Sequence, residues 1–166
     1  DYSKHLRDIV DIDAAHMTAT VQPGLVLDAL NAALKKHGLW FPVDVSTSAQ
    51  ATLGGMAGNN SCGSRSIAYG NMVHNVLGAS AWLSDGTHVQ LGRFDHSTGR
   101  AKALGEHVQQ LAQQLGPELE THWPKVLRRV AGYNLDVFHN QNPRPYTSDG
   151  SVNLSHLLIG SEGTLA

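Results

Sequence analysis

The chain has 166 residues, the size of a single domain with a core of its own. Twelve Lys and Arg against fourteen Asp and Glu give a formal net charge of −2, which excludes the basic surface that nucleic acid or an anionic membrane would attract. The only cysteine, Cys62, excludes an internal disulfide and a cysteine-based metal cluster within the chain.

The first predicted elements are a β-hairpin over residues 8–22 and a helix over residues 25–37. Ile9, Val10 and Ile12 precede a short connection, and alternating apolar residues follow it up to Pro23-Gly24. The helix is predicted from leucines that recur at i, i+3 and i+7, and Gly38 is in the right place to end it.

The second half of the chain predicts another hairpin and two helices. Residues 75–84 are predicted to form a buried strand, which Asp85-Gly86 turns into a partner strand at residues 88–91. Helices are expected from Leu104 to Leu115, ended by Gly116-Pro117, and again over residues 124–130. Residues 140–150 have the composition of a polar loop. Hairpins mixed with helices, without regular β-α-β alternation, predict an α+β domain.

A glycine-rich segment, residues 51–63, is the strongest functional signal. It contains four glycines and the pair Asn59-Asn60, and few side chains large enough to fill a core. One short helix is expected within it, with Thr52 near its N-terminus. Glycine lets the backbone approach a ligand closely, and consecutive N–H groups in a turn form a concavity that binds anions. Phosphate is therefore the predicted ligand. By composition alone, a surface loop that only turns the chain fits equally well.

Other segments are candidates for the same site, each with a simpler explanation. The hydroxyls of Ser46 and Thr47 suit a phosphate oxygen or a plain turn. Tyr69 suits a position beside a ligand or half-buried packing. Residues 160–164, Gly-Ser-Glu-Gly-Thr, form a second glycine turn or an ordinary connection between elements. Glu162 is expected to fix this turn by accepting hydrogen bonds from backbone or from the segment at residues 46–47, because phosphate would repel a free carboxylate.

The spacing of the residues supports neither a metal site nor a nucleophilic catalytic site. The chain has ten histidines, but none is two or four positions from another, as a metal site on one element would require. Cys62 fits better as a small apolar residue than as a nucleophile. The sequence has neither a Gly-x-Gly-x-x-Gly dinucleotide fingerprint nor a Gly-Lys-Ser/Thr phosphate loop.

The order of the motifs resembles a known family. The matching segments are Val21-Gln22-Pro23-Gly24, Asp44-Val45-Ser46-Thr47, Thr52-Leu53-Gly54-Gly55-Met56, Asn59-Asn60, Gly63, Tyr69-Gly70 and Asp85-Gly86. They resemble the FAD-binding domain of FAD-linked oxidases of the vanillyl-alcohol oxidase and p-cresol methylhydroxylase (PCMH) type. Residues 132–135 and 158–165 resemble the D-2-hydroxy-acid dehydrogenase branch, which includes D-lactate dehydrogenases and the glycolate oxidase large subunit. The insert between them resembles the long members that also carry an iron–sulfur domain.

The resemblance implies the second subdomain of a PCMH-type FAD-binding domain, an α+β unit whose mixed or antiparallel sheet is flanked by helices. FAD is the implied cofactor. Residues 46–63 are implied to line its pyrophosphate and ribityl region, with further contacts from residues 160–164. The implied cofactor-binding residues are Ser46, Thr47, Thr52, Gly54, Gly55, Asn59, Gly63, Tyr69, Gly160, Glu162 and Gly163.

The implied activity is flavin-dependent oxidation of a D-2-hydroxy acid of the D-lactate, glycolate or D-2-hydroxyglutarate type. Residues 1–166 are expected to be a single-domain piece of a larger FAD-binding domain, without its first phosphate loop and the cap domain that holds substrate. No catalytic residue or metal ligand is therefore assigned to this chain, and an iron–sulfur cluster would belong to the longer protein. The expected compartment is the cytoplasm, with the periphery of the inner membrane as the alternative.

Two other classes of function remain open at this point. The chain could be a phosphate- or nucleotide-binding module without redox activity, or a structural domain whose glycine turns only shape an interface. Bound flavin would separate the first hypothesis from both of these.

Overall fold

The computed structural model describes residues 4–166. The elements, in chain order, are strands β1 (Ile9–Asp13) and β2 (Thr18–Val21), helix α1 (Leu27–Leu34), the 3₁₀ turn η1 (Lys35–His37), helices α2 (Leu53–Gly58), α3 (Ser66–Tyr69) and α4 (Met72–Asn75), strands β3 (Ala79–Trp82) and β4 (His88–Leu91), the 3₁₀ turn η2 (Phe94–His96), helices α5 (Gly99–Gln114) and α6 (Gly116–His122), and the 3₁₀ turns η3 (Leu135–Phe138) and η4 (Leu154–Leu157). The α+β class is confirmed. None of the helices formed by these residues is long and apolar enough to cross a membrane.

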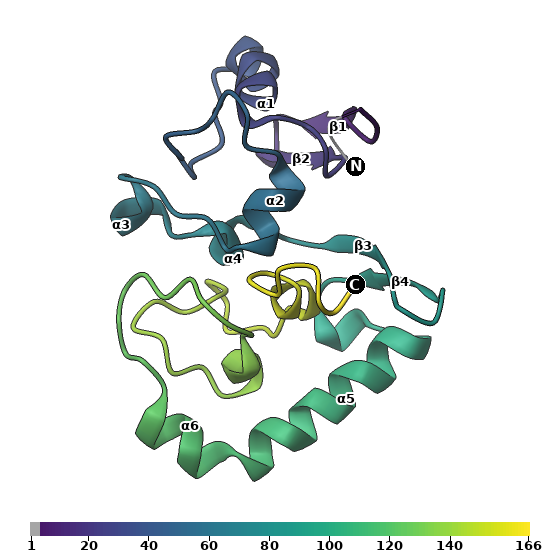
Figure 1. Cartoon of the computed structure of the whole chain (residues 1–166), viewed down its shortest axis with the longest axis vertical. Helices are drawn as coiled ribbons and strands as arrows, with labels where there is room; N and C mark the ends of the chain where they lie inside the picture. Colours follow the sequence, from purple (N-terminus) through teal and green to yellow (C-terminus); the bar gives the residue numbers. More distant parts are fainter. Residues whose placement is uncertain (1–3) are drawn as a thin grey trace.

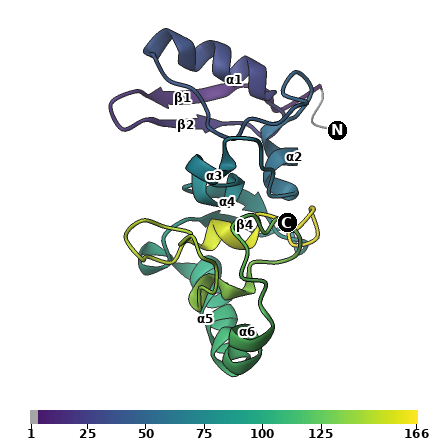
Figure 2. The ribbon, with the colours of Figure 1, turned by 90° about the vertical axis from the view of Figure 1, so that its left-hand side faces the viewer.

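The N-terminal layer is the predicted hairpin with α1 lying across it (Figure 2). Strands β1 and β2 pair antiparallel, with Ile9 opposite Val21. Leu27, Leu30 and Leu34 are buried on one face of α1, as their spacing predicts. Gly38 follows with φ of 71°, a left-handed conformation that ends the helical segment at little steric cost for glycine.

Helix α2 lies between the N-terminal layer and the C-terminal half of the molecule (Figure 1). It begins where the glycine-rich segment predicts it, with Thr52 as the N-cap residue whose hydroxyl accepts a hydrogen bond from the Gly55 amide. Leu53 and Met56 are buried in the core that α2 shares with α1, α4 and the hairpin. The glycine-rich segment is therefore anchored in the larger of the two hydrophobic cores of the described residues.

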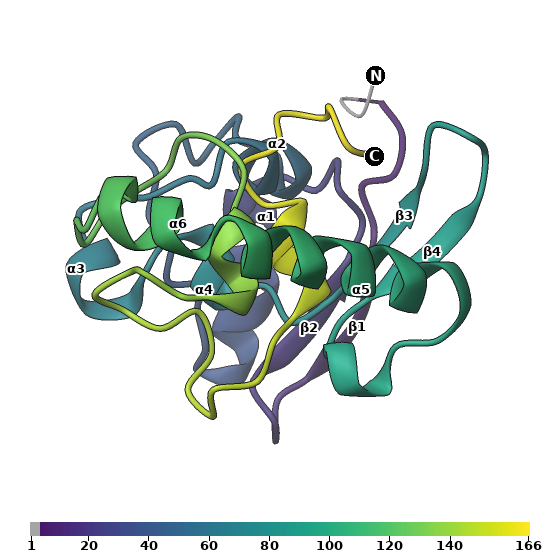
Figure 3. The ribbon, with the colours of Figure 1, turned by 90° about the horizontal axis from the view of Figure 1, so that it is seen from below.

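The C-terminal half is built on α5, which runs across the lower side of the molecule beside β4 (Figure 3). Its buried residues are small: Ala101, Gly105 and Ala112. A Cβ atom at Gly105 would lie 2.6 Å from the ring of Phe94, so this glycine allows the helix to pack closely. The helix begins five residues before the predicted start at Leu104. The prediction relied on large apolar residues, whereas the buried residue in the first turn of the helix is the small Ala101.

The predicted buried strand over residues 75–84 is confirmed only in part, because β3 covers Ala79–Trp82 and none of its residues is buried. The chain first forms α4 and joins a strand only at Ala79, and the side chain of Trp82 is exposed. A reciprocal cap between Asn71 and His74 explains the helix, because the His74 ring accepts a hydrogen bond from the Asn71 amide at 3.1 Å.

The predicted helix over residues 124–130 is wrong. Helix α6 forms instead just before it, with Pro117 in its first turn, where the missing N–H group is not needed. Trp123 ends α6 in an extended conformation because the following Pro124 disfavours helical geometry in the residue before it. The strands also form two separate two-stranded antiparallel sheets rather than one sheet.

Candidate functional site

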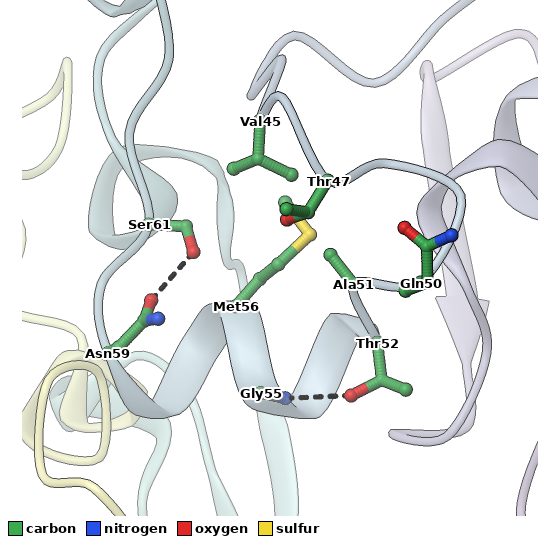
Figure 4. Close-up of a pocket in the computed structure, with 9 residues that line it drawn as sticks. All are labelled: Val45, Thr47, Gln50, Ala51, Thr52, Gly55, Met56, Asn59 and Ser61. Atoms are coloured by element: carbon green, nitrogen blue, oxygen red, sulfur yellow. Dashed lines mark hydrogen bonds between the residues drawn. The ribbon is translucent and has the colours of Figure 1, made fainter. Parts of the chain in front are cut away.

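An open depression of about 340 Å³ lies between the turn at residues 46–50 and helix α2 (Figure 4). The residues that line it are Val45, Thr47, Gln50, Ala51, Thr52, Gly55, Met56, Asn59 and Ser61. None of these lining residues has a charged side chain, and hydroxyl and amide groups supply the polar surface. A phosphate group could therefore approach the depression without meeting a carboxylate on its wall.

The turn at residues 46–50, which contributes Thr47 and Gln50 to the wall of this depression, has free backbone donors. The amides of Gln50 and Ala51 both donate to the Thr47 carbonyl at 2.8 Å. The four preceding amides, at residues 46–49, donate no hydrogen bond to any residue of the range 4–166. Consecutive unpaired N–H groups beside the Thr47 hydroxyl are the kind of donor set that holds phosphate.

In the first turn of α2, by contrast, the backbone amides are already hydrogen-bonded within the protein. The Leu53 amide donates to the Leu25 carbonyl and the Gly54 amide to the Pro23 carbonyl, both at 2.8 Å. The Gly55 amide donates to the Thr52 hydroxyl at 3.3 Å. The expected set of free amides therefore lies in the turn before the glycine-rich helix and not in the helix itself.

The predicted site glycines fall into two groups. A Cβ atom at Gly54 would lie 2.6 Å from Pro23 Cβ, and one at Gly63 would overlap the backbone carbonyl and the carboxylate of Asp44. These two glycines allow parts of the protein to pack against each other. A Cβ atom at Gly55 would meet only the Thr52 hydroxyl, at 3.0 Å, and Gly55 is exposed at the depression. Gly55 is thus the glycine whose backbone is open to a ligand.

The second glycine turn docks on the other end of α2. The Gly160 amide donates to the Ala57 carbonyl at 3.0 Å, and the Glu162 amide donates to the Gly58 carbonyl at 2.9 Å. Gly160, Glu162 and Gly163 all have positive φ. The structure therefore brings the two glycine-rich regions together at a single short helix, although about a hundred residues separate them in the sequence.

Glu162 does not stabilise the turn in the expected way. Its carboxylate accepts no hydrogen bond from the described residues 4–166, and its side chain is exposed. The contribution of Glu162 to the turn is its backbone amide and its φ of 54°. The expectation of hydrogen bonds from Ser46 or Thr47 to this carboxylate is wrong.

Tyr69 lies apart from the residues that line the depression. Its ring packs edge-on against Trp40, with 5.3 Å between the centroids, and the Arg65 guanidinium lies 4.7 Å from the Trp40 ring centroid. The Arg65 amide donates to Asp44, and the Ser64 hydroxyl, which also donates to that carboxylate, lowers its pKa. These contacts account for Tyr69 and Arg65 without a ligand.

A second depression, of about 360 Å³, lies at the start of α5. It is lined in part by His88, His96 and Arg100, whose side chains are exposed. It has neither a glycine-rich wall nor a contact with α2, so the first depression is the better candidate for a phosphate-bearing ligand.

Comparison with known proteins shows the class of the domain. Residues 1–92 match the model of the FAD binding domain family, and the chain belongs to this family. The match covers β1 to β4 and the whole of the first depression. FAD is accordingly the cofactor that the domain is built to bind.

The relatives come from one group of FAD-linked enzymes. The chain is 32% identical to D-2-hydroxyglutarate dehydrogenase of Pseudomonas putida over 99% of its own length and 16% of the relative's. It is 29% identical to the probable mitochondrial D-lactate dehydrogenase of Danio rerio over 98% of its length and 23% of the relative's. Glycolate oxidase subunit GlcD of Bacillus subtilis is 36% identical over 54% of the chain and 19% of the relative. The chain thus spans at most about a quarter of these relatives.

Sequence reasoning missed the residues that hold the second glycine turn in place. Asn134 is fully buried, and its side-chain amide donates to the carbonyls of His156 and Ile159 just before Gly160. The motif that contains Asn134 contributes to the family resemblance, but its role depends on contacts more than 20 residues away. An asparagine between apolar and aromatic residues, in a segment without loop composition, was the available signal.

Proposed function

We propose that this chain is the FAD-binding part of a flavin-dependent enzyme that oxidises a D-2-hydroxy acid. The observation that carries the proposal is the set of free amides at residues 46–49, in the turn that borders a neutral depression inside the segment that matches the FAD binding domain family. The alternative is a phosphate- or nucleotide-binding module without redox activity.

The residues of the first depression fit the diphosphate of FAD. The free amides at residues 46–49 and the Thr47 hydroxyl would donate hydrogen bonds to phosphate oxygens, and the bare backbone at Gly55 would allow the chain close to the ligand. The turn at residues 160–164 would bound the same site from the far end of α2. Bound FAD supplies a flavin ring that accepts hydride, and the protein binds and orients it.

The substrate class rests on the relatives. The D-2-hydroxyglutarate dehydrogenases match the chain from end to end, whereas GlcD matches about half of it. The relatives that match nearly the whole chain therefore favour the branch of the D-2-hydroxyglutarate and D-lactate dehydrogenases. The substrate is proposed to be a D-2-hydroxy acid bound by parts of the protein outside this chain, in the cytoplasm or at the periphery of the inner membrane.

Replacing Gly55 by valine tests the placement of the cofactor. We expect the Gly55→Val protein to retain less than about a tenth of the wild-type flavin, because a β-branched side chain would fill the space beside the open backbone of Gly55 at the depression. The measurement is flavin absorbance per mole of purified whole protein. Gly116→Val is the matched control, since a Cβ atom there meets nothing within 4 Å. Equal flavin content in Gly55→Val and wild type would contradict the placement.

Anaerobic addition of substrate separates the proposal from its alternative. If the proposal holds, D-lactate, glycolate or D-2-hydroxyglutarate bleaches the flavin absorbance of the whole protein. Bound flavin that none of the three acids reduces, while dithionite does, would favour a binding module without this activity.

A further inference from the structure

A buried polar network lies under the second glycine turn. Asn134 and Asp136 have no solvent exposure, and Tyr146 is 8% exposed. Arg129 joins them, with its guanidinium bonded to the side-chain carbonyl of Asn134 and, at 3.1 Å, to the Tyr146 hydroxyl. Burying this many polar groups is unfavourable unless they are hydrogen-bonded, so their partners indicate what the network holds.

Asn134 directs both of its side-chain N–H groups at the backbone that leads into the turn. Its Nδ2 atom donates to the carbonyls of His156 and Ile159, each at 2.8 Å. Its Oδ1 atom accepts a hydrogen bond from Arg129. The amide is fully used, and its orientation is fixed, because a flipped amide would place an N–H group against the guanidinium.

Arg129 is itself held from several sides. Its Nη1 atom donates to the Ala131 carbonyl at 2.7 Å, and its guanidinium lies 4.5 Å from the centroid of the Trp123 ring. The Tyr146 hydroxyl, which accepts from Arg129, donates to Asp136 at 2.7 Å. The hydroxyl thus connects the buried cation to the buried carboxylate, although the two charged side chains form no direct ion pair among residues 4–166.

The same segment is also attached to the first glycine-rich region. The backbone carbonyl of Arg129 accepts hydrogen bonds from the side-chain amides of Asn60 and Asn71, at 3.4 and 3.3 Å. The side-chain carbonyl of Asn60 in turn accepts from the Val73 amide at 3.0 Å. Residues 129–134 therefore connect the end of the first glycine-rich segment with the start of the second glycine turn.

We propose that Asn134, oriented by Arg129, is a positioning residue for FAD: it sets the turn at residues 160–164 against α2 and so sets the affinity and the environment of the bound cofactor. The inference rests on the proposed FAD site. Two observations distinguish this role from simple core packing. The donor bonds of Asn134 end on the carbonyls of Ile159, next to Gly160, and of His156, four residues before it. The exposed Tyr133 hydroxyl lies 2.8 Å from Thr164 Oγ1 at the other end of the same turn.

The Asn134→Asp variant tests the proposal in the whole protein. The substitution keeps the size of the side chain and its oxygen toward Arg129, but it removes the N–H groups that hold Ile159 and His156. We expect the FAD dissociation constant to rise at least about tenfold. We also expect the visible circular dichroism of the flavin to differ from wild type at saturating FAD, a signal that loss of global stability alone would not change.

Asp136→Asn is the matched control. It alters the same buried network, but none of its partners, Tyr146, Gln141 and Asn142, is hydrogen-bonded to residues 160–164 in the described part of the chain. We expect it to lower the urea midpoint while the FAD dissociation constant stays within about twofold of wild type. Unchanged affinity and an unchanged spectrum in Asn134→Asp, or an equal loss of affinity in both variants, would overturn the positioning role.

The Tyr133→Phe variant tests the same positioning role if the Asn134→Asp protein does not fold. It removes only the exposed hydroxyl that bonds Thr164, so the fold should persist, and we expect the FAD dissociation constant to rise about two- to threefold. An unchanged constant in this variant would count against the proposal. Wild-type protein that binds no FAD would instead refute the proposed function, which keeps the two failures distinct.

Discussion

The Gly63→Ala protein is expected to lose at least about 3 kcal/mol of its free energy of unfolding, a large fraction of the roughly 5–15 kcal/mol typical of a domain. The added Cβ atom would overlap the carbonyl and the carboxylate of Asp44, and the Gly63 amide is fixed by a 2.9 Å hydrogen bond to the Ser66 hydroxyl. Neither neighbour is the free end of a flexible chain, so the backbone itself must shift. Urea denaturation followed by tryptophan fluorescence measures the loss.

Gly116→Ala is the control for this substitution. Its Cβ atom meets nothing within 4 Å, and the residue begins α6, where alanine is favoured over glycine by up to about 1 kcal/mol. Unchanged or slightly raised stability is expected. If Gly63→Ala and Gly116→Ala had the same urea midpoint, the tight packing of residue 63 against Asp44 would be wrong.

Stability is expected to fall by about 3 kcal/mol between pH 6.5 and pH 4 because of His156 alone. Burial lowers the pKa of His156 to about 4, and its ring also contacts the Val76 carbonyl at 3.1 Å. In the unfolded chain a histidine titrates near pH 6.5, so over this window the unfolded state takes up a proton that the folded state does not. The stabilisation is present above pH 6.5 and is lost as the pH falls toward 4.

Other buried titratable groups also affect how the stability of the protein depends on pH. Burial also lowers the pKa of His74, so the contribution of His74 to the stability of the protein likewise falls as the pH falls. Burial raises the pKa of Asp136, so this carboxyl favours the folded state in acid and opposes the histidines at the lower end of the window. Burial raises the pKa of Tyr146 as well, far above this range.

The variant His156→Gln isolates the contribution of His156. A glutamine keeps a side-chain N–H group for the Val76 carbonyl but does not titrate, so the loss of stability from pH 6.5 to 4 should shrink by about 3 kcal/mol. His122→Gln, at an exposed position on α6, should leave the profile as it is. The same slope in His156→Gln and wild type would show that His156 does not remain neutral in the folded protein.

The elements that sequence predicted correctly are those with local signals. The leucines of α1, Gly38, the Thr52 cap and the Asp85-Gly86 turn each act within a few residues of the structure they specify. The failures lie where two local signals compete. The strand-like composition from Asn75 onward did not show that Asn75 still belongs to α4, whose cap pairs Asn71 with a histidine in place of the usual glutamate or glutamine, or that strand pairing begins only at Ala79.

The site was predictable as a region but not atom by atom. The family resemblance implied that residues 46–63 and 160–164 belong to one site. It could not show that Gly54 and Gly63 pack against Pro23 and Asp44 while Gly55 stays open, since those neighbours come from other parts of the chain. The free amides depend equally on which carbonyls other segments leave unused, and that is a property of the tertiary structure.

Hydrogen–deuterium exchange of the whole protein, with and without FAD, tests the central claim most directly. Bound FAD should slow exchange of the amides at residues 46–49 at least about tenfold, since they donate no hydrogen bond within residues 4–166, and it should also slow exchange at residues 160–164. The turn at Asp85-Gly86 should exchange as before. Protection confined to the second depression, around His88 and Arg100, with no change at residues 46–49, would contradict this account of the site.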